Sequence, residues 1–218
     1  LFLCDVSVKG KMGNVRLYGS KPFDVVVVHG GPGAPGGMRP VACELAKEYG
    51  VIEPLQSEDT LEKQVEELHD AIVDSATAPI TLVGWSWGGM LSYIVAARYP
   101  SCVKKLILVG SAVFDDNYME EIMPTRMSRL NDTEKATLHH LFEILKSSDD
   151  SDKKDAFKVF GALIEKADSY DPIHHEEEAF AFQPEIYNKV WPEAQMFRKE
   201  GHLLSLGKEI SSPVIAIH

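Results

Sequence analysis

Two kinds of segment, which differ in the spacing of their apolar positions, alternate along the first 114 residues. Short apolar runs, such as Val25–Val28 and Leu106–Val109, have the length of strands, and Val25–Val28 is typical of a strand buried on both faces of a parallel sheet. Between such runs lie segments with an apolar stripe at helical spacing, for example from Leu61 to Ile72. Repeated strands and helices predict an α/β fold, in which a mostly parallel sheet is flanked by helices.

Turn and capping residues set the predicted bounds of these elements. Gly50 should end one helix, and Asp59 with Glu62 three residues later forms a capping box at the start of another. The predicted elements are a hairpin of Leu1–Val8 and Val15–Tyr18, a strand Val25–Val28, a helix Met38–Tyr49, a strand Val51–Ile52, a helix after Asp59, a strand Pro79–Gly84, a helix Trp87–Tyr99 and a strand Val103–Val109.

The pattern becomes helical and acidic after Ser111. Thr133–Leu145 and Asp152–Lys166 predict helices, and proline residues divide the following segment into shorter pieces. Strand character returns only at Pro213–Ile217. If the helical region is an insertion into one sheet, Val103–Val109 and Pro213–Ile217 must be neighbouring parallel strands.

These changes of pattern divide the chain into three parts. Residues 1–114 form the N-terminal part of the sheet core, and residues 115–205 form an inserted helical cap. Residues 206–218 return the chain to the core sheet, without the final strand and helix that we would expect to follow.

Charge and composition exclude several classes of function. The net charge of −11 argues against a nucleic-acid partner, since nucleic-acid binding needs a basic face. No apolar run approaches the roughly 18 residues needed to span a bilayer, so no membrane partner is expected. The 3 cysteines are an odd number without metal-site spacing, which favours a cytoplasmic location and predicts no metal site.

One motif places a serine between a predicted strand and a predicted helix. The sequence Gly84-Trp85-Ser86-Trp87-Gly88-Gly89 contains G-x-S-x-G, which in this context is typical of a nucleophile elbow. Such a turn exposes the serine hydroxyl at the carboxyl edge of the sheet, beside the N-terminus of the helix. We therefore expect Ser86 to be a catalytic nucleophile.

A second motif follows the Val25–Val28 strand directly. The sequence His29-Gly30-Gly31-Pro32-Gly33 is a loop whose glycines allow bare backbone to approach a substrate. Acyl transfer needs N–H donors that hold the oxyanion, normally the amide after the nucleophile, here Trp87, and one from this loop. Both motifs are expected at carboxyl ends of strands, where ligands bind in such sheets.

Together these two motifs resemble the α/β-hydrolase superfamily and, within it, the proline iminopeptidase-like branch. The resemblance implies a Ser-His-Asp triad with Ser86 as nucleophile, an oxyanion hole formed by Gly31 and Trp87, and no cofactor. It also implies that His29 shapes its loop and is not the catalytic base. The expected activity is cleavage of an ester or amide bond through an acyl-enzyme at Ser86.

The sequence departs from this family at the other two members of the triad. The family's acid normally follows the strand at Pro213–Ile217 and its histidine follows the last strand, so both are expected beyond His218. The sequence is therefore interpreted as a C-terminally shortened hydrolase with impaired activity. Asp115 or Asp116, which follow the strand at Val103–Val109, are alternative candidates for the acid.

The sequence leaves several classes of substrate open. The acidic cap favours a cation, and Glu176 and Glu177 could bind the free amine of a short peptide. Trp191 could line an apolar pocket for the acyl group. A small molecule or short peptide is the expected partner, and esterase, aminopeptidase and lactonase activities remain alternatives; the oligomeric state is not predicted.

Two other classes of function compete with the hydrolase. The segment from Gly31 to Gly36 satisfies G-x-G-x-x-G, and Glu53 lies 22 residues after Gly31, as in a dinucleotide-binding fingerprint. However, Pro32 and Pro35 remove N–H donors that a pyrophosphate would need. The other alternative is a non-catalytic protein that keeps the hydrolase fold and uses its pocket to bind a ligand.

Overall fold

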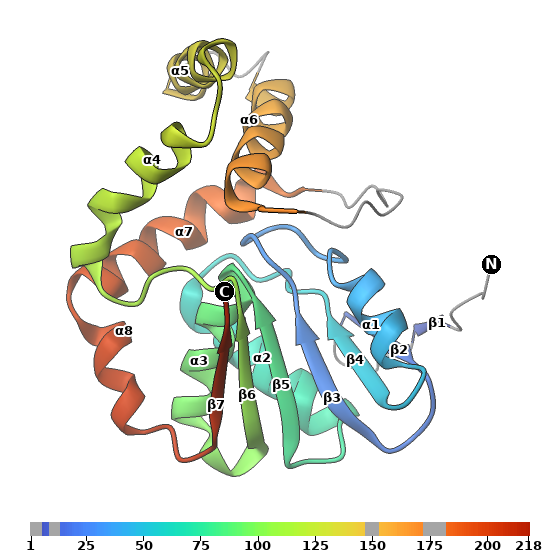
Figure 1. Cartoon of the computed structure of the whole chain (residues 1–218). Coiled ribbons are helices and arrows are strands. Elements are labelled where there is room, and N and C mark those ends of the chain that lie inside the picture. The colour runs from blue at the N-terminus through green and yellow to red at the C-terminus, as the bar shows by residue number, and fades with distance from the viewer. Residues whose placement is uncertain (1–5, 9–13, 147–152, 172–181) are drawn as a thin grey trace. The chain divides into compact units, whose positions relative to one another are not determined.

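One sheet of seven strands, in the order β1-β2-β4-β3-β5-β6-β7, runs through the described part of the computed structural model (Figure 1). β1 and β2 pair antiparallel, as do β2 and β4, whereas the strands from β4 to β7 along the sheet are parallel. The structure describes residues 6–8, 14–146, 153–171 and 182–218. The strands are β1 (Val6–Val8), β2 (Val15–Tyr18), β3 (Phe23–Val28), β4 (Gly50–Pro54), β5 (Ile80–Trp85), β6 (Val103–Val109) and β7 (Val214–Ile217).

Helices cover both faces of this sheet, as the predicted α/β fold requires. Alternate residues of β3 point to opposite faces: Val26 and Val28 pack in the core beside α2 (Leu61–Ser75) and α3 (Trp87–Arg98). Val25 and Val27 pack on the other face, in the core beside α1 (Arg39–Leu45). The mostly parallel α/β sheet predicted from the sequence is thus confirmed, although α1 is shorter than predicted.

The chain divides into two compact units. The core unit contains residues 1–116 and 177–218, and the helical unit is Asn117–Glu176. The helical unit contains α4 (Met119–Ser128), α5 (Asp132–Lys146) and α6 (Lys153–Asp168), around a small core of Leu130, Leu138 and Ala167.

The helical unit ends earlier than the predicted boundary at residue 205. α7 (Pro184–Lys199) and α8 (His202–Ser205) belong to the core unit, because Val190, Ala194 and Leu203 are buried in the core cluster of the sheet. α7 is also one helix and not several short pieces. It continues through Pro192, which is exposed, while Val190 and Ala194 are held in the core.

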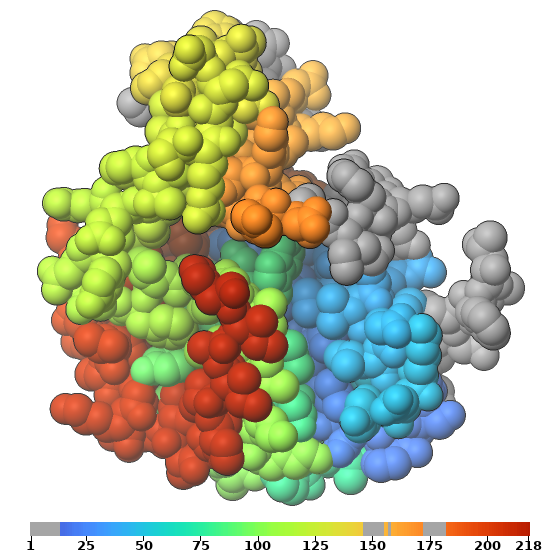
Figure 2. Space-filling view, in the orientation of Figure 1, coloured from blue at the N-terminus to red at the C-terminus, as the bar shows by residue number. Residues whose placement is uncertain are grey.

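The return of the chain to the sheet follows the prediction. β7 pairs in parallel with β6, with Leu106 opposite Val214 and Val109 opposite Ile217. The prediction that these two segments are neighbouring parallel strands is therefore confirmed. All four residues of β7 are exposed, and the strand lies at the surface in Figure 2.

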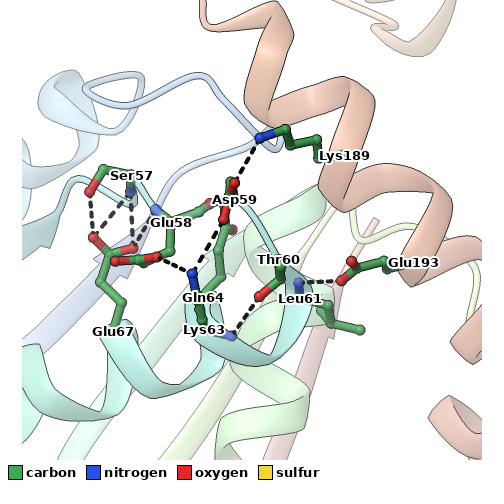
Figure 3. Close-up of polar contacts among 10 residues, drawn as sticks. All are labelled: Ser57, Glu58, Asp59, Thr60, Leu61, Lys63, Gln64, Glu67, Lys189 and Glu193. Atoms are coloured by element: carbon green, nitrogen blue, oxygen red, sulfur yellow. Dashed lines mark hydrogen bonds and ion pairs between the residues drawn. The ribbon is translucent and has the colours of Figure 1, made fainter.

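The start of α2 differs from the predicted capping box. Thr60, and not Asp59, is the N-cap, and its hydroxyl accepts a hydrogen bond from the Lys63 amide at 3.3 Å. Asp59 instead accepts one from Lys189 of α7 at 2.8 Å. Glu193, also on α7, has a carboxylate that accepts a hydrogen bond from the first amide of α2, Leu61 N–H, at 2.7 Å (Figure 3). A neighbouring helix therefore supplies part of the cap that sequence spacing assigned to local residues.

A very close contact fixes α3 against the sheet. A Cβ at Gly88 would collide with the carbonyl oxygens of Val28 and His29, and one at Gly84 would collide with the Gly88 carbonyl. These neighbours are backbone atoms, which cannot rotate out of the way as a side chain can. Only glycine therefore lets the first turn of α3 lie against the ends of β3 and β5.

A buried carboxylate holds the far end of the loop that follows β3. Glu53 is fully buried, and it accepts hydrogen bonds from the Tyr18 hydroxyl at 2.5 Å and from the Met38 amide at 3.0 Å. The Arg16 guanidinium lies 3.6 Å from the same carboxylate. Burial, together with the hydrogen bond to Glu53, raises the pKa of Tyr18, so its hydroxyl stays a donor. Paired in this way, the buried charge is a stable anchor.

His29 holds the near end of the same loop. Its side chain is fully buried; Nδ1 lies 2.7 Å from the Gly30 carbonyl oxygen, and Nε2 accepts the Gln56 amide at 3.3 Å. These partners assign the proton to Nδ1 and make the ring neutral. Burial lowers the pKa of His29 to about 4, although the bond to the Gly30 carbonyl opposes this shift.

We predict that Gly88→Ala lowers the free energy of unfolding of the chain by about 3 kcal/mol, because the new methyl group overlaps two backbone carbonyls. The control is Gly161→Ala in α6, where a Cβ meets nothing within 4 Å; it should be neutral or stabilising by up to about 1 kcal/mol. Denaturant unfolding measures both. Equal effects of the two substitutions would contradict the proposed contact.

We also predict that His29 makes stability depend on pH. A histidine whose folded pKa lies below its unfolded value stabilises the fold above about pH 6.5, and this stability is lost as pH falls toward the folded value of about 4. His29→Asn should therefore be less stable than wild type at pH 7, and the gap should shrink by about 3 kcal/mol at pH 4. Urea unfolding of both proteins across this range tests it; a gap independent of pH would refute the assignment.

Candidate functional site

Ser86 lies at the junction between β5 and α3 in a strained backbone conformation. Its φ is 52° and its ψ is −116°, and among the described residues it is the one non-glycine residue with positive φ. Such a conformation costs about 1–3 kcal/mol and persists only where surrounding structure enforces it. Here the Ser86 amide donates to the Val109 carbonyl at 3.0 Å, and the close contacts of Gly84 and Gly88 fix both sides of the turn.

The turn places Ser86 directly before the first residue of α3, Trp87. The first amides of a helix have no partner within the helix and carry its positive dipole end. The Trp87 amide thus lies at the N-terminus of α3, directly after Ser86, and its role as an oxyanion donor stays a prediction from the sequence. Its indole ring is buried in the core, with 1 % of the residue exposed, so the amide sits on a rigid support.

The loop after β3 lies against this turn. A Cβ on Gly30 would lie 2.8 Å from the Trp85 ring and 3.6 Å from the Ser86 Cβ, so bare backbone passes beside the serine. Gly31 follows with φ of +124°, a conformation that L side chains rarely adopt. Farther along, the Gly33 carbonyl accepts the Gln183 amide at 2.7 Å, which connects the loop to the start of α7. The structure thus brings the Gly30 backbone beside Ser86, and Gly31 is the next residue along the loop.

Aromatic side chains of α7 pack beside the predicted oxyanion residue. Trp191 lies edge-on to Trp87 with ring centroids 6.2 Å apart, and it stacks on Tyr187 at 6.0 Å. Trp191 is half-buried, as expected for a side chain that lines an apolar surface. The sequence identified Trp191 but not Tyr187, although the spacing of four residues on one helix face was a usable signal.

Two further predicted residues have no described position. Glu176 and Glu177, the candidate ligands for a substrate amine, lie outside the described residues. Their assignment stays a prediction from the sequence.

No base is hydrogen-bonded to Ser86 among the described residues. Within residues 14–146, 153–171 and 182–218, no side chain forms a hydrogen bond with the Ser86 hydroxyl. His29 has both ring nitrogens occupied and a low pKa, which agrees with a loop-shaping role. His69 is on α2, where it stacks on Tyr99 at 3.8 Å.

The alternative acids lie after β6 and are partly buried, but Asp116 has another partner. Its carboxylate accepts a hydrogen bond from Arg198 Nε at 3.0 Å. Only 3 % of Arg198 is exposed, so this pair holds the end of α7 near the chain that leaves β6. Sequence analysis missed the pair, because a charged residue near a helix end is normally exposed and nothing local marks it as buried.

The geometry around Glu53 argues against the dinucleotide alternative. The acidic residue of that fingerprint must reach a ribose hydroxyl. Glu53 is fully buried, and Tyr18 and Met38 occupy its two oxygens. Its position 22 residues after Gly31 therefore reflects a structural role in the sheet.

Neither a metal-binding cluster nor a membrane-spanning helix occurs among the described residues. Across the described ranges, no group of three or more His, Cys, Asp or Glu residues is arranged to hold a metal ion. No helix in the same part of the chain combines the length and apolar character needed to cross a membrane.

Residues 25–140 match the family described as the alpha/beta hydrolase fold. A shorter stretch is 39% identical over 57 residues to cis-3-alkyl-4-alkyloxetan-2-one decarboxylase of Shewanella oneidensis. This stretch covers 25% of the chain and 18% of that enzyme, so the chain spans only a small part of this relative.

Solved structures show the same fold at low sequence identity. The chain superposes on VinJ with a TM-score of 0.60 and 18% identity, over 99% of the chain and 81% of VinJ. E-2-(acetamidomethylene)succinate hydrolase gives a TM-score of 0.55 and 18% identity, over 99% of the chain and 80% of that structure. The thioesterase domain of the curacin biosynthetic pathway gives a TM-score of 0.54 and 18% identity, over 98% of the chain and 81% of that domain. Because the family match alone spans more than half of its residues, the chain belongs to the α/β hydrolase fold family.

Proposed function

We propose that the protein is a serine hydrolase that cleaves an ester or amide bond through an acyl-enzyme at Ser86. The observation that carries this proposal is the backbone of Ser86, with φ of 52° between β5 and α3. A strained residue at the carboxyl edge of the sheet is explained if its hydroxyl must face a substrate. A serine that merely capped the helix would accept a hydrogen bond from the first turn, and Ser86 makes no such side-chain bond.

The proposed reaction has two steps. In the first, the Ser86 oxygen attacks the carbonyl carbon while a general base takes its proton, and the leaving alcohol or amine departs with a proton returned by that base. In the second, water attacks the acyl ester, releases the acid and restores the Ser86 hydroxyl. The amides of Trp87 and Gly31 would stabilise the oxyanion formed in both steps. The base would be a residue outside the described ones, and the acid would be either such a residue or Asp115, which follows β6.

The finer proposal is an aminopeptidase of the proline iminopeptidase type. It rests on the resemblance of the two motifs at His29–Gly33 and Gly84–Gly89. A related alternative is a lactone substrate, favoured by the short match to a decarboxylase whose name includes an oxetan-2-one, a cyclic ester. All of these substrates present a carbonyl carbon to the same nucleophile, and the aromatic surface of Trp191 and Tyr187 would contact the acyl group.

The first test removes the nucleophile. Ser86→Ala should abolish labelling by a fluorophosphonate probe in the intact natural protein, because the probe reacts only with an activated serine. Turnover of a p-nitrophenyl ester should fall by about 10⁴- to 10⁶-fold, as in serine enzymes that lose their nucleophile. Mass spectrometry of the labelled peptide and steady-state rates measure the two effects.

Ser111→Ala is the matched control, because Ser111 also follows a parallel strand and lies beside Gly89, but in ordinary backbone. It should keep both labelling and turnover. Undiminished labelling of Ser86→Ala would remove Ser86 from the mechanism. A wild-type protein that binds ester analogues but is never labelled would instead be the non-catalytic binding protein.

The second test concerns the class of substrate. An aminopeptidase should release p-nitroaniline from prolyl-p-nitroanilide with a kcat/KM at least about 10-fold above that for the N-acetylated compound, which lacks the free amine. An esterase or lactonase would not distinguish the two compounds and would instead prefer p-nitrophenyl butyrate or a β-lactone. Equal, low rates on both anilides would contradict the aminopeptidase proposal and leave the Ser86 proposal intact.

A further inference from the structure

The start of α7 packs against the glycine loop that follows β3, at Gly33, two residues beyond the candidate oxyanion donor Gly31. The Gly33 carbonyl accepts a hydrogen bond from the Gln183 amide at 2.7 Å. A Cβ at Gly33 would lie 2.5 Å from the Gln183 carbonyl oxygen and 3.4 Å from the Tyr187 amide nitrogen. Backbone therefore lies against backbone here, and neither side can rotate away from the other as a side chain could.

Gly33 is a position that only glycine fits without displacement of its neighbours. Its φ is +82°, a conformation that L side chains rarely adopt. A contact of 2.5 Å is also shorter than real Cβ atoms make, so a side chain here would have to push the loop and α7 apart. Loop and helix thus meet in one closely defined arrangement.

The loop passes the position of Gly33 on to Gly31. A Cβ at Gly31 would lie 2.9 Å from the Gly33 amide nitrogen and 3.0 Å from that of Ala34, so the loop folds tightly back on itself. Pro32, between the two glycines, has a φ that its ring restricts. A loop this compact cannot move Gly33 without also moving the Gly31 amide.

α7 supports the loop firmly, because other contacts fix the helix to the core. Figure 1 shows α7 at the carboxyl ends of the strands, and its Val190 is buried in the core cluster. The Glu193 carboxylate accepts the Leu61 amide of α2 at 2.7 Å (Figure 3). Near the end of the helix, the buried Arg198 guanidinium donates to Asp116 at 3.0 Å. The loop at Gly33 therefore rests on a helix that is itself held in place.

The position of an oxyanion donor matters more for rate than for substrate binding. The full negative charge on the oxygen develops only in the transition state, so a donor acts there and not on the bound substrate. A displacement of about 1 Å in such a site can cost about 100-fold in rate. A contact that fixes the Gly31 amide should therefore act on kcat.

We propose that Gly33 is a positioning residue for the oxyanion donor Gly31, and that the contact between Gly33 and α7 sets the rate of the chemical step. Gly33 acts through the backbone of Pro32 and Gly31 and not by contact with the substrate. The inference rests on the proposed serine hydrolase activity, and it adds α7 to the elements on which that activity depends.

The test is Gly33→Ala in the intact natural protein, assayed with p-nitrophenyl butyrate. The new methyl group displaces the loop from α7, so kcat should fall about 10- to 100-fold. KM should stay within about 3-fold of wild type, because the same oxyanion donors serve both steps of the reaction.

A trifluoromethyl ketone gives a second readout, which a purely structural role of Gly33 would not change. The Ser86 oxygen bonds to its carbonyl carbon, the serine proton passes to the base, and the carbonyl oxygen becomes an oxyanion beside the Gly31 and Trp87 amides. Gly33→Ala should weaken inhibition by this ketone by the same factor as it lowers kcat/KM. The corresponding trifluoromethyl alcohol, which cannot accept the serine oxygen, should inhibit both proteins equally.

Gly36→Ala is the matched control in the same loop. Gly36 also has positive φ, +93°, but the three atoms nearest to a Cβ there would belong to the Arg16 guanidinium, at 3.1 Å or more. The end of a flexible side chain can move aside. This variant carries similar backbone strain and leaves α7 undisturbed, so its kcat should stay within about 3-fold of wild type.

Variants of Gln183 decide the question if Gly33→Ala does not fold. Gln183→Pro deletes the N–H that donates to the Gly33 carbonyl, whereas Gln183→Ala keeps it. The kcat of Gln183→Pro should therefore be about 10-fold below that of Gln183→Ala. Equal kcat values for these two variants would contradict the proposal.

Two further results would overturn the proposal. A folded Gly33→Ala with the kcat of Gly36→Ala would show that the contact serves the fold alone, and it would leave the assignment of Ser86 intact. A raised KM with unchanged inhibition by the ketone would show that Gly33 does not act on the oxyanion donor. Turnover that survives Ser86→Ala would instead overturn the proposed function, and this inference with it.

Discussion

The candidate active site depends on how closely the first turn of α3 can approach the ends of β3 and β5. Carbonyl oxygens of Val28 and His29 occupy the space where a side chain at Gly88 would lie, and Gly84 faces the Gly88 carbonyl in the same way. Ser86 lies between these two glycines and adopts positive φ. The Gly30 backbone, which follows His29, lies beside Ser86 in the same region. One steric constraint thus acts on the elements that carry both the candidate nucleophile and its candidate oxyanion donors.

Other contacts hold the glycine loop after β3 in place. Glu53 binds the Met38 amide at one end of the glycine loop, and neutral His29 fixes the other end. From outside the sheet, α7 reaches the same region through the bond between Gln183 and Gly33 and through the contact of Trp191 with Trp87. Because these anchors come from β4, β3 and α7, the loop is held from three directions. Such support is what a preorganised oxyanion site requires.

Local sequence patterns predicted the parts of the fold that local physics decides. Short apolar runs predicted β3 and β6, and the glycines around Ser86 predicted the sharp turn between β5 and α3, because each pattern reflects a constraint within a few residues. The N-cap of α2 and the extent of α7 were predicted wrongly, because tertiary contacts decide them. Lys189 draws Asp59 away from the cap, and burial of Val190 and Ala194 carries α7 through Pro192. The pair of Glu53 with Tyr18 and the pair of Arg198 with Asp116 could not be predicted either, because each joins residues far apart in the sequence.

The most direct test of this account is the crystal structure of the intact natural protein after reaction with a phosphonate ester. The account predicts a bond from Ser86 Oγ to phosphorus, with Ser86 still at positive φ. It also predicts that the phosphoryl oxygen lies about 2.7–3.1 Å from the amide nitrogens of Trp87 and Gly31. A phosphonate attached to another residue, or a phosphoryl oxygen directed away from these two amides, would contradict the central claim that the close α3–β3 contact builds the catalytic site.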